Sequence, residues 1–177
     1  MVSVNVTSNG SGYVDDFTLS YAKTPTITSN ASIVVTTEFS PSGGPCTARY
    51  ITKKVTLADG FDAGDLKVLL DANLPEGSDI HVYYKVLSAD DNTPFEERGY
   101  GKMVLATEPP APAANRFDFV ELEYRPTLTG GFINYIGNNG STYDTFREFA
   151  IKITMTSSDP SVIPRIKNLR VIAMPEE

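Results

Sequence analysis

Two groups of acidic residues are the clearest candidates in the sequence for a metal site or a catalytic site. Asp59, Asp62 and Asp65 stand three positions apart in "ADGFDAGDLK". EF-hand calcium loops place their ligands at every second position, so a calcium site would have to be an irregular loop. The alternative, which we favour, is a turn in which Asp and Gly serve the backbone.

The second acidic group lies in "SADDNTPFEERGYGK" and consists of Asp90, Asp91, Glu96 and Glu97. A glycosidase needs two carboxyl groups that face each other across the bond to be cleaved. Because these four residues cluster in one apparent loop, the sequence predicts a solvated turn.

The single histidine and single cysteine leave little for other chemistry. A zinc site or a histidine-based triad needs more partners than His81 can find here. Cys46 has no general base near it in sequence and cannot form an internal disulfide, which indicates a structural or incidental thiol and a reducing compartment of synthesis. The glycines of "GSGY", "GYGK" and "LTGGF" lack the lysine-serine ending of a phosphate loop. We therefore predict no enzyme, no catalytic residues, no metal and no cofactor.

The best loop for a ligand or a partner is "GGFINYIGNNGSTYD". Tyr135, Asn138, Asn139 and Tyr143 crowd this glycine-rich segment, and aromatic and amide side chains can contact a sugar. A plain hairpin or a subunit contact explains the same residues, so the loop is a candidate ligand or partner site.

Period-two alternation dominates the elements that must position these residues. In "DIHVYYKVL", Ile80, Val82, Tyr84 and Val86 share one face, and "FAIKITMT" alternates in the same way. Further candidate strands are "YVDDFTLSYA", "SIVVTTEF", "ARYITKKVTL", "DLKVLLDA", "GKMVLAT", "FDFVELEY", "GFINYI" and "NLRVIAM". The pattern predicts an all-β, antiparallel β-sandwich, jelly-roll-like, of about eight to ten strands. The predicted core is Leu66, Val68, Leu70, Ile80, Val82, Tyr84, Val86, Val120, Leu122, Phe149, Ile151 and Ile153.

Helix is expected at most as one short turn, in "STYDTFREFAI", where Ser141 could cap it. Residues 1–44 read as an N-terminal β arm or small β-unit, and residues 45–177 as the sandwich domain. The proline-alanine segment 107–115 is predicted to cross the sandwich as a loop within that domain. The C-terminal "IKNLRVIAM" is predicted to be fully integrated, with Pro175 ending the strand.

Composition narrows the function classes. The chain has 177 residues, 41% of them hydrophobic, and a net charge of −7. Binding to nucleic acid needs a clustered positive surface, so this charge argues against it. No stretch reaches the roughly 20 apolar residues of a membrane span, and the N-terminus lacks the pattern of a signal peptide.

Three stretches carry a resemblance to a known family. The run "ARYITKKVTLADGFDAGDLKVLLDANLPEGSDIHVYYKVLSADD", then "FVELEYRP", then "FREFAIKITMTSSDPSVIPRIKNLRVIAMPE" resemble the C-terminal β-domain of virion structural proteins of contractile-tailed, T-even-like phages. They are similar to cyanophage baseplate and tail proteins over about residues 47–175. The arm, with "SNGSGY" and "TPTIT", is similar to β-repeats upstream in such proteins.

The resemblance implies a non-enzymatic structural component of the tail or baseplate. Its partners would be other virion proteins or a second copy of itself, and it would be made in the host cytoplasm and reside in the virion. The alternative is a carbohydrate- or receptor-binding sandwich of the tail-fibre type that contacts a host surface glycan.

Overall fold

The computed structural model describes residues 2–7, 16–21, 46, 48–128, 132–159 and 161–175. The chain divides into two compact units, Met1–Pro45 and Cys46–Glu177. This division lies one residue from the boundary predicted between positions 44 and 45. The predicted strand "SIVVTTEF" (residues 32–39) lies outside the described residues.

The first unit contains an antiparallel pair of strands. β1 (Val2–Thr7) pairs with β2 (Asp16–Tyr21), with Val2 opposite Tyr21 and Thr7 opposite Asp16. β2 falls within the predicted "YVDDFTLSYA", whereas β1 was not predicted.

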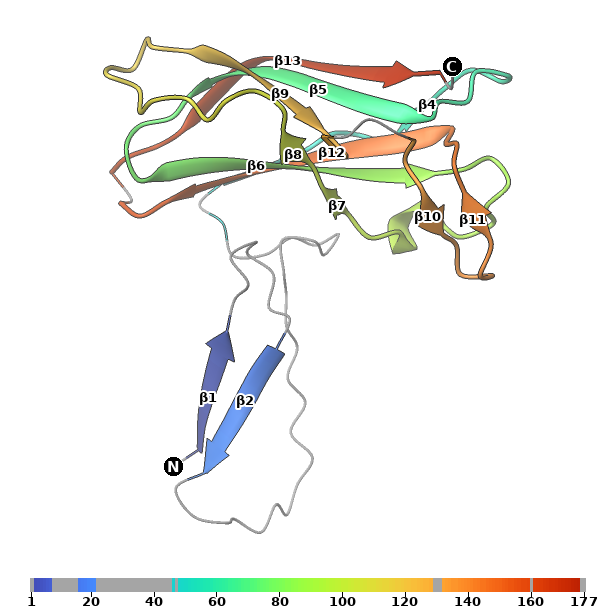
Figure 1. Ribbon diagram of the computed structural model, residues 1–177, viewed down its shortest axis with the longest axis horizontal. Coiled ribbons are helices and arrows are strands. Elements are labelled where there is room, and N and C mark those ends of the chain that lie inside the picture. Colours follow the sequence, from blue (N-terminus) through green and yellow to red (C-terminus); the bar gives the residue numbers. More distant parts are fainter. Residues whose placement is uncertain are drawn as a thin grey trace. The chain divides into compact units, whose positions relative to one another are not determined.

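The second unit is a sandwich of two antiparallel sheets that face each other (Figure 1). The five-stranded sheet has the order β3-β12-β6-β7, and β4 also pairs with β12. The four-stranded sheet has the order β13-β5-β9-β8. The strands are β3 (Ala48–Ile51), β4 (Val55–Thr56), β5 (Asp65–Asn73), β6 (Ser78–Leu87), β7 (Gly101–Lys102), β8 (Val104–Leu105), β9 (Val120–Arg125), β12 (Glu148–Ser157) and β13 (Arg165–Met174).

The predicted all-β antiparallel sandwich is therefore confirmed, and the jelly-roll connectivity stays a prediction. Among the described residues, the only helical element is the short 3₁₀ turn η1 (Phe95–Glu97). The expected limit of one short helical turn therefore holds, although no helix forms in "STYDTFREFAI", where Thr142 and Tyr143 form a strand and Ser141 belongs to a hairpin turn.

The core lies between the sheets and matches the alternation. Ten of the twelve predicted core residues are fully or almost fully buried there, among them Leu66, Val82 and Ile151. Val120 is 39% exposed because it begins β9 at the end of the sandwich, so its prediction was wrong. Tyr84 is only half-buried and packs against the edge of the core.

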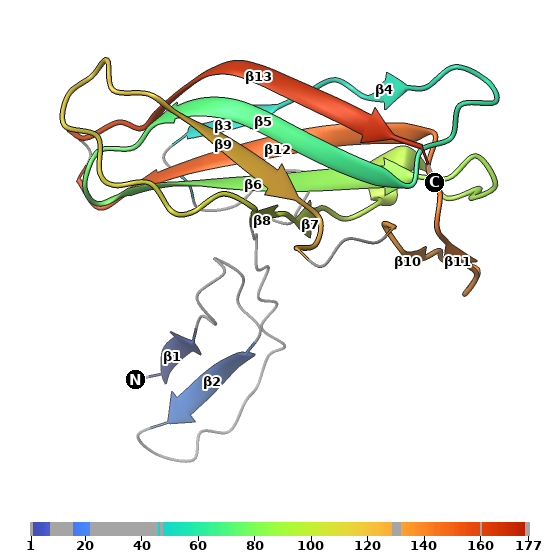
Figure 2. The same ribbon diagram turned by 45° about the horizontal axis from the view of Figure 1, so that its top comes forward.

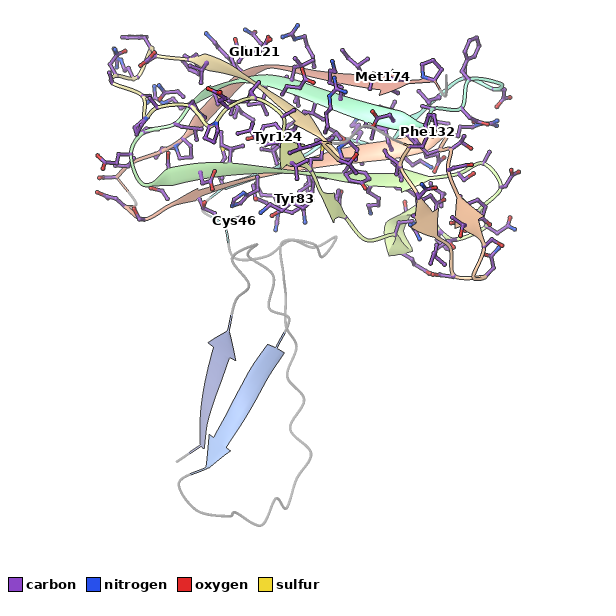
Figure 3. All side chains as sticks on the ribbon, viewed as in Figure 1. Cys46, Tyr83, Glu121, Tyr124, Phe132 and Met174 are labelled. Carbon is purple, nitrogen blue, oxygen red and sulfur yellow. The ribbon has the colours of Figure 1, made fainter. Side chains whose placement is uncertain are left out.

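A buried tyrosine ties the sheets together. Tyr124 of β9, labelled in Figure 3, donates its hydroxyl to the carbonyl of Ile80 on β6 at 3.2 Å. Burial raises the pKa of this hydroxyl, with the Asp79 carboxylate adding to the rise, so it stays a proton donor at neutral pH.

The outer face of the five-stranded sheet is buried as well, although the alternation predicted a face open to solvent. Tyr83, Lys85, Lys152 and Thr154 point to this face, and each is at least nine-tenths buried. Phe95 and Tyr100 from the segment after β6 pack over it. The Lys85 ammonium lies 4.9 Å from the Phe95 ring centroid and 4.8 Å from that of Tyr100. Cation–π contacts of this kind offset part of the cost of burying the charge.

The two lateral sides of the sandwich differ. On one side the chain passes directly from β7 to β8 through buried Met103, whose N–H donates to the Val82 carbonyl at 2.8 Å. That connection closes the gap between the sheets. On the other side β13 ends one sheet, while β3 and β4 end the other (Figure 2). We call this second side the open side.

The C-terminal strand is integrated as predicted. β13 pairs along its length with β5, from Arg165 opposite Asn73 to Met174 opposite Asp65, and Pro175 follows it. The register shifts between Lys167 and Arg170, where Asn168 has a positive φ of 52°. This β-bulge increases the local twist of an edge strand.

Segment 107–115 joins β8 to β9, which are neighbours in one sheet, and so does not cross the sandwich. The side-chain amide of buried Asn73 donates to the carbonyls of Asn115 and Asp118, at 2.8 and 2.6 Å, and so holds the end of this connection.

Candidate functional site

The four predicted ligand residues lie on one small hairpin. β10 (Tyr135–Ile136) pairs with β11 (Thr142–Tyr143), with Tyr135 directly opposite Tyr143. Their ring centroids are 5.4 Å apart. The sequence reading of a hairpin is therefore correct, and two of its aromatic residues stack on each other.

The asparagines of this hairpin form its turn. Asn139 accepts a hydrogen bond from the Ser141 amide at 2.9 Å and donates to the Tyr143 hydroxyl at 3.0 Å. Asn138 is exposed beside it. Gly140 has a φ of +80°, a conformation that glycine adopts without steric cost. Asn139 thus uses its side chain within the turn.

The hairpin docks on the loop after β6. The Ser88 amide donates to the Tyr135 hydroxyl at 2.7 Å, and the Tyr143 hydroxyl donates to the Asp90 carbonyl at 3.3 Å. Arg98 lies over the Tyr135 ring, with its Cζ 3.9 Å from the centroid, and its Nη1 donates to the Ile136 carbonyl at 3.3 Å. Residues far apart in the chain are thereby fixed around one tyrosine.

Asp91 is buried at this junction, although its loop was predicted to be solvated. Its Oδ1 accepts from the Thr93 amide at 3.0 Å, while Oδ2 makes no hydrogen bond of ordinary geometry with any described residue. Burial alone would raise the pKa of this carboxyl, but the Thr93 hydrogen bonds, the Tyr135 hydroxyl dipole and the Arg98 charge hold it below its ordinary value. Asp90, Glu96 and Glu97 are exposed, as expected of a turn.

Tyr135 is the predicted residue that borders a cavity. Burial raises the pKa of its hydroxyl to about 12, and the neighbouring Asp91 carboxylate adds to the rise, so the group is neutral at physiological pH. The cavity has a volume of about 220 Å³. It is lined by Tyr84, Val86, Arg98, Tyr100, Ile133 and Tyr135, and by two glycines at positions 99 and 101. We call it the tyrosine cavity.

The two glycines shape the tyrosine cavity differently. A Cβ at Gly101 would come within 2.9 Å of the Tyr84 ring, so this position requires glycine. A Cβ at Gly99 would meet no atom within 4 Å, and Gly99 is exposed. The cavity therefore borders solvent at Gly99.

Sequence reasoning missed most of this cavity. The sequence predicts Tyr84 in the core, and it excludes "GYGK" as a phosphate loop without indicating a cavity there. No local pattern marks the cavity, because its lining comes from three separate segments: Tyr84 and Val86 on β6, residues 98–101, and residues 133–135.

The other candidate residues have structural partners. Arg147 forms ion pairs with Asp59 and Asp62, at 3.0 Å each, and the Asp65 carboxylate accepts from the Leu66 amide. His81 lies 3.6 Å from Asp79, and Cys46 is a half-buried free thiol. Within the described ranges, no three His, Cys, Asp or Glu residues are grouped so that they could hold a metal ion. No helix in the same ranges is long and apolar enough to span a membrane.

Comparison with protein-family models, with curated proteins and with solved structures finds no significant match to this chain.

Proposed function

We propose that the protein is a non-enzymatic structural component of a phage virion, in the tail or baseplate, that works through protein–protein contacts. Its partners are other virion proteins or a second copy of the chain. It is made in the host cytoplasm and resides in the particle. The similarity of about residues 47–175 to virion β-domains supports the setting, and the open side of the sandwich supports the mode of action.

The open side is the observation that carries the proposal. Residues directly opposite each other on paired strands share a face, so Tyr50 and Val55, opposite core residues Ile153 and Phe149, point inward. Tyr50 is nevertheless 47% exposed and Val55 40%. Inward-facing side chains are normally the best buried in a sandwich.

The facing edge strand shows the same incomplete burial. On β13, Leu169, Val171 and Ala173 pack against the core but are only half-buried, whereas Leu66 and Val68 of neighbouring β5 are fully buried. In the part of the chain that the structure describes, β13 pairs on one side only, with β5.

A protein partner fits such a side for two reasons. Covering these apolar side chains contributes roughly 25 cal/mol per Å² of apolar surface removed from water. The free edge of β13 also offers backbone donors and acceptors, which an extended segment of a partner can pair with. The bulge at Asn168 disturbs the first half of this edge, so we expect pairing along the second half, Leu169–Met174.

Cross-linking of purified particles tests the proposal, followed by mass spectrometry and cryo-electron microscopy of the same sample. Lys53 and Lys54 lie between β3 and β4 at the open side and are exposed. We expect them to cross-link to another virion protein or to a second copy. Lys102 of β7, on the side where the β7–β8 connection closes the gap between the sheets, is the reference position that we expect not to cross-link to the same partner. Purified particles that lack the chain would contradict the virion proposal, and particles in which the open side faces solvent would contradict the assembly surface.

A further inference from the structure

The tyrosine cavity combines an apolar floor with the guanidinium of Arg98, which has more N–H donors than its hydrogen bond to Ile136 uses. Val86 and Ile133, which belong to the core, form part of its lining and are almost fully buried. Tyr84, Tyr100 and Tyr135 add ring surfaces. Small-molecule sites have this composition, with mostly apolar and aromatic walls and a few placed polar groups.

Arg98 is the polar group that gives the cavity its chemistry. Guanidinium carries five N–H donors, and its Nη1 donates to the Ile136 carbonyl. Its Nε is buried and makes no hydrogen bond to any described residue. Because this Nε is inaccessible, the donors left for a ligand are the remaining N–H groups of Nη1 and Nη2.

The stacking of Arg98 fixes the orientation of these donors. The guanidinium lies 3.9 Å from the Tyr135 ring centroid, and the Ser88 amide and the hairpin pairing hold that ring in place. A planar fork that is already oriented loses less entropy when it binds a carboxylate through two parallel hydrogen bonds. No carboxylate of the described residues forms an ion pair with Arg98, although the Asp91 carboxylate lies close enough for the Arg98 charge to lower its pKa.

The size of the cavity limits the ligand. Its 220 Å³ is below the roughly 300–1,000 Å³ of sites for drug-sized molecules, which suits a single ring. The ring must offer an apolar face to Val86 and Ile133 and a carboxylate to Arg98. A pyranose that carries a carboxylate has both, because its C–H face is apolar and its rim is polar.

We propose that the tyrosine cavity binds an acidic sugar residue, such as a uronic acid unit of a polysaccharide, with the carboxylate on Arg98 and the ring against Val86 and Ile133. The ligand enters at Gly99. This site is separate from the open side, so it does not depend on the assembly function.

Nuclear magnetic resonance titration of the full chain tests the site with methyl β-glucuronide. The amides of Gly99 and Gly101 report on the cavity, and we expect saturable shifts at both. Methyl β-glucoside, which has a hydroxymethyl group in place of the carboxylate, should bind about tenfold more weakly or not at all, because a charge-assisted bidentate bond is lost. Acetate tests whether the carboxylate alone is enough for binding, and benzoate tests whether an aromatic ring with a carboxylate binds as well as the sugar does. If acetate bound with the same affinity as the glucuronide, or if benzoate bound more tightly, the assignment of a sugar would be overturned.

Three variants locate the binding. Arg98→Lys keeps the charge but loses the planar fork, and we expect about tenfold weaker binding of the glucuronide. Gly99→Leu, at a position with open space, should block entry without disturbing the fold. Arg116→Met is the matched control, since Arg116 also lies over an aromatic ring, that of Phe117, but borders a different hollow. Unchanged affinity in Arg98→Lys and Gly99→Leu, or loss of affinity in Arg116→Met, would overturn the proposed site.

Discussion

At the residue scale, buried polar groups hold the loops of this protein in place. Asp91 is surrounded by Thr93, Tyr135 and Arg98, and a Cβ at Gly137 would lie 3.2 Å from its Oδ2. The sequence places Asp91 in a run of acidic and turn-forming residues, which is typical of a solvated loop. Its burial follows from the hairpin β10–β11, which is more than forty residues away in the chain.

The Asp91 carboxylate should make stability depend on pH on the acid side. Its folded-state pKa lies below the unfolded value of about 3.9, so its contribution is present above that value and is lost as the pH falls through the folded pKa. We expect Asp91→Asn to be less stable than the parent at pH 7, and the difference to shrink as the pH falls from about 5 to below 4. Urea unfolding across this range measures it, with the exposed Asp144→Asn as control. A difference that is constant with pH would show that Asp91 does not titrate in this way.

Asn168 sustains the bulge in β13. Its φ is 52°, and its side-chain amide donates to the Asp71 carboxylate at 2.7 Å. Asparagine and glycine tolerate this left-handed conformation, whereas a β-branched residue is strained there by roughly 1–2 kcal/mol. Asn168→Val should therefore unfold at lower urea concentration than Asn168→Gly, although both lose the hydrogen bond to Asp71. Equal midpoints for the two variants would contradict the strain argument.

At the element scale, the strands of the sandwich could be predicted because one face of each is buried. Period-two alternation marks that face directly, and it identified β5, β6, β12 and β13. The burial of the outer face of β6 and β12 could not be predicted, since Lys85 and Lys152 read as solvent-facing residues. Lys85 lies against the Phe95 and Tyr100 rings and Lys152 against that of Tyr100, and local pattern does not encode these contacts.

The hairpin β10–β11 shows the same limit at shorter range. Its strands have two residues each, too few for a period to be visible, and "STYDTFREFAI" begins with a residue that commonly caps helices. Gly140 at positive φ and the pairing with Tyr135 decide the outcome. Of the candidate site, the sequence therefore identified the loop and Tyr135 but not Arg98 or the cavity.

The closing strand β13 should be indispensable. Removing residues 166–177 would uncover the edge of β5 and expose Leu66 and Val68, which are fully buried in the complete chain. An apolar central strand turned into an edge strand promotes aggregation. We expect the truncated protein to be insoluble, while a chain that ends at Pro175 retains all of β13 and stays soluble. A monomeric protein with an unchanged melting temperature after the longer deletion would contradict this role.

At the scale of the sandwich unit, the two proposed functions occupy opposite sides. The open side is built from β13, β3 and β4, which end the two sheets, whereas Tyr84 and Gly101 of the tyrosine cavity lie on β6 and β7 at the other side. A partner protein on the open side would leave the cavity accessible. The arrangement is thus compatible with a structural protein that also contacts a glycan.

The sandwich unit should fold without the first 45 residues. Among the described residues, the pairings of its two sheets and its large hydrophobic core involve positions 48–174. We expect a fragment of residues 46–177 to give a β-type circular dichroism spectrum and a cooperative thermal transition within a few degrees of the full chain. Val82→Asp in the same fragment is the unfolded reference, because a charge in the fully buried position of Val82 costs several kcal/mol. If the spectrum and the transition of the fragment resembled those of that variant, the sandwich unit would need the first 45 residues to fold. The division at Pro45 would then not separate two independently folding units.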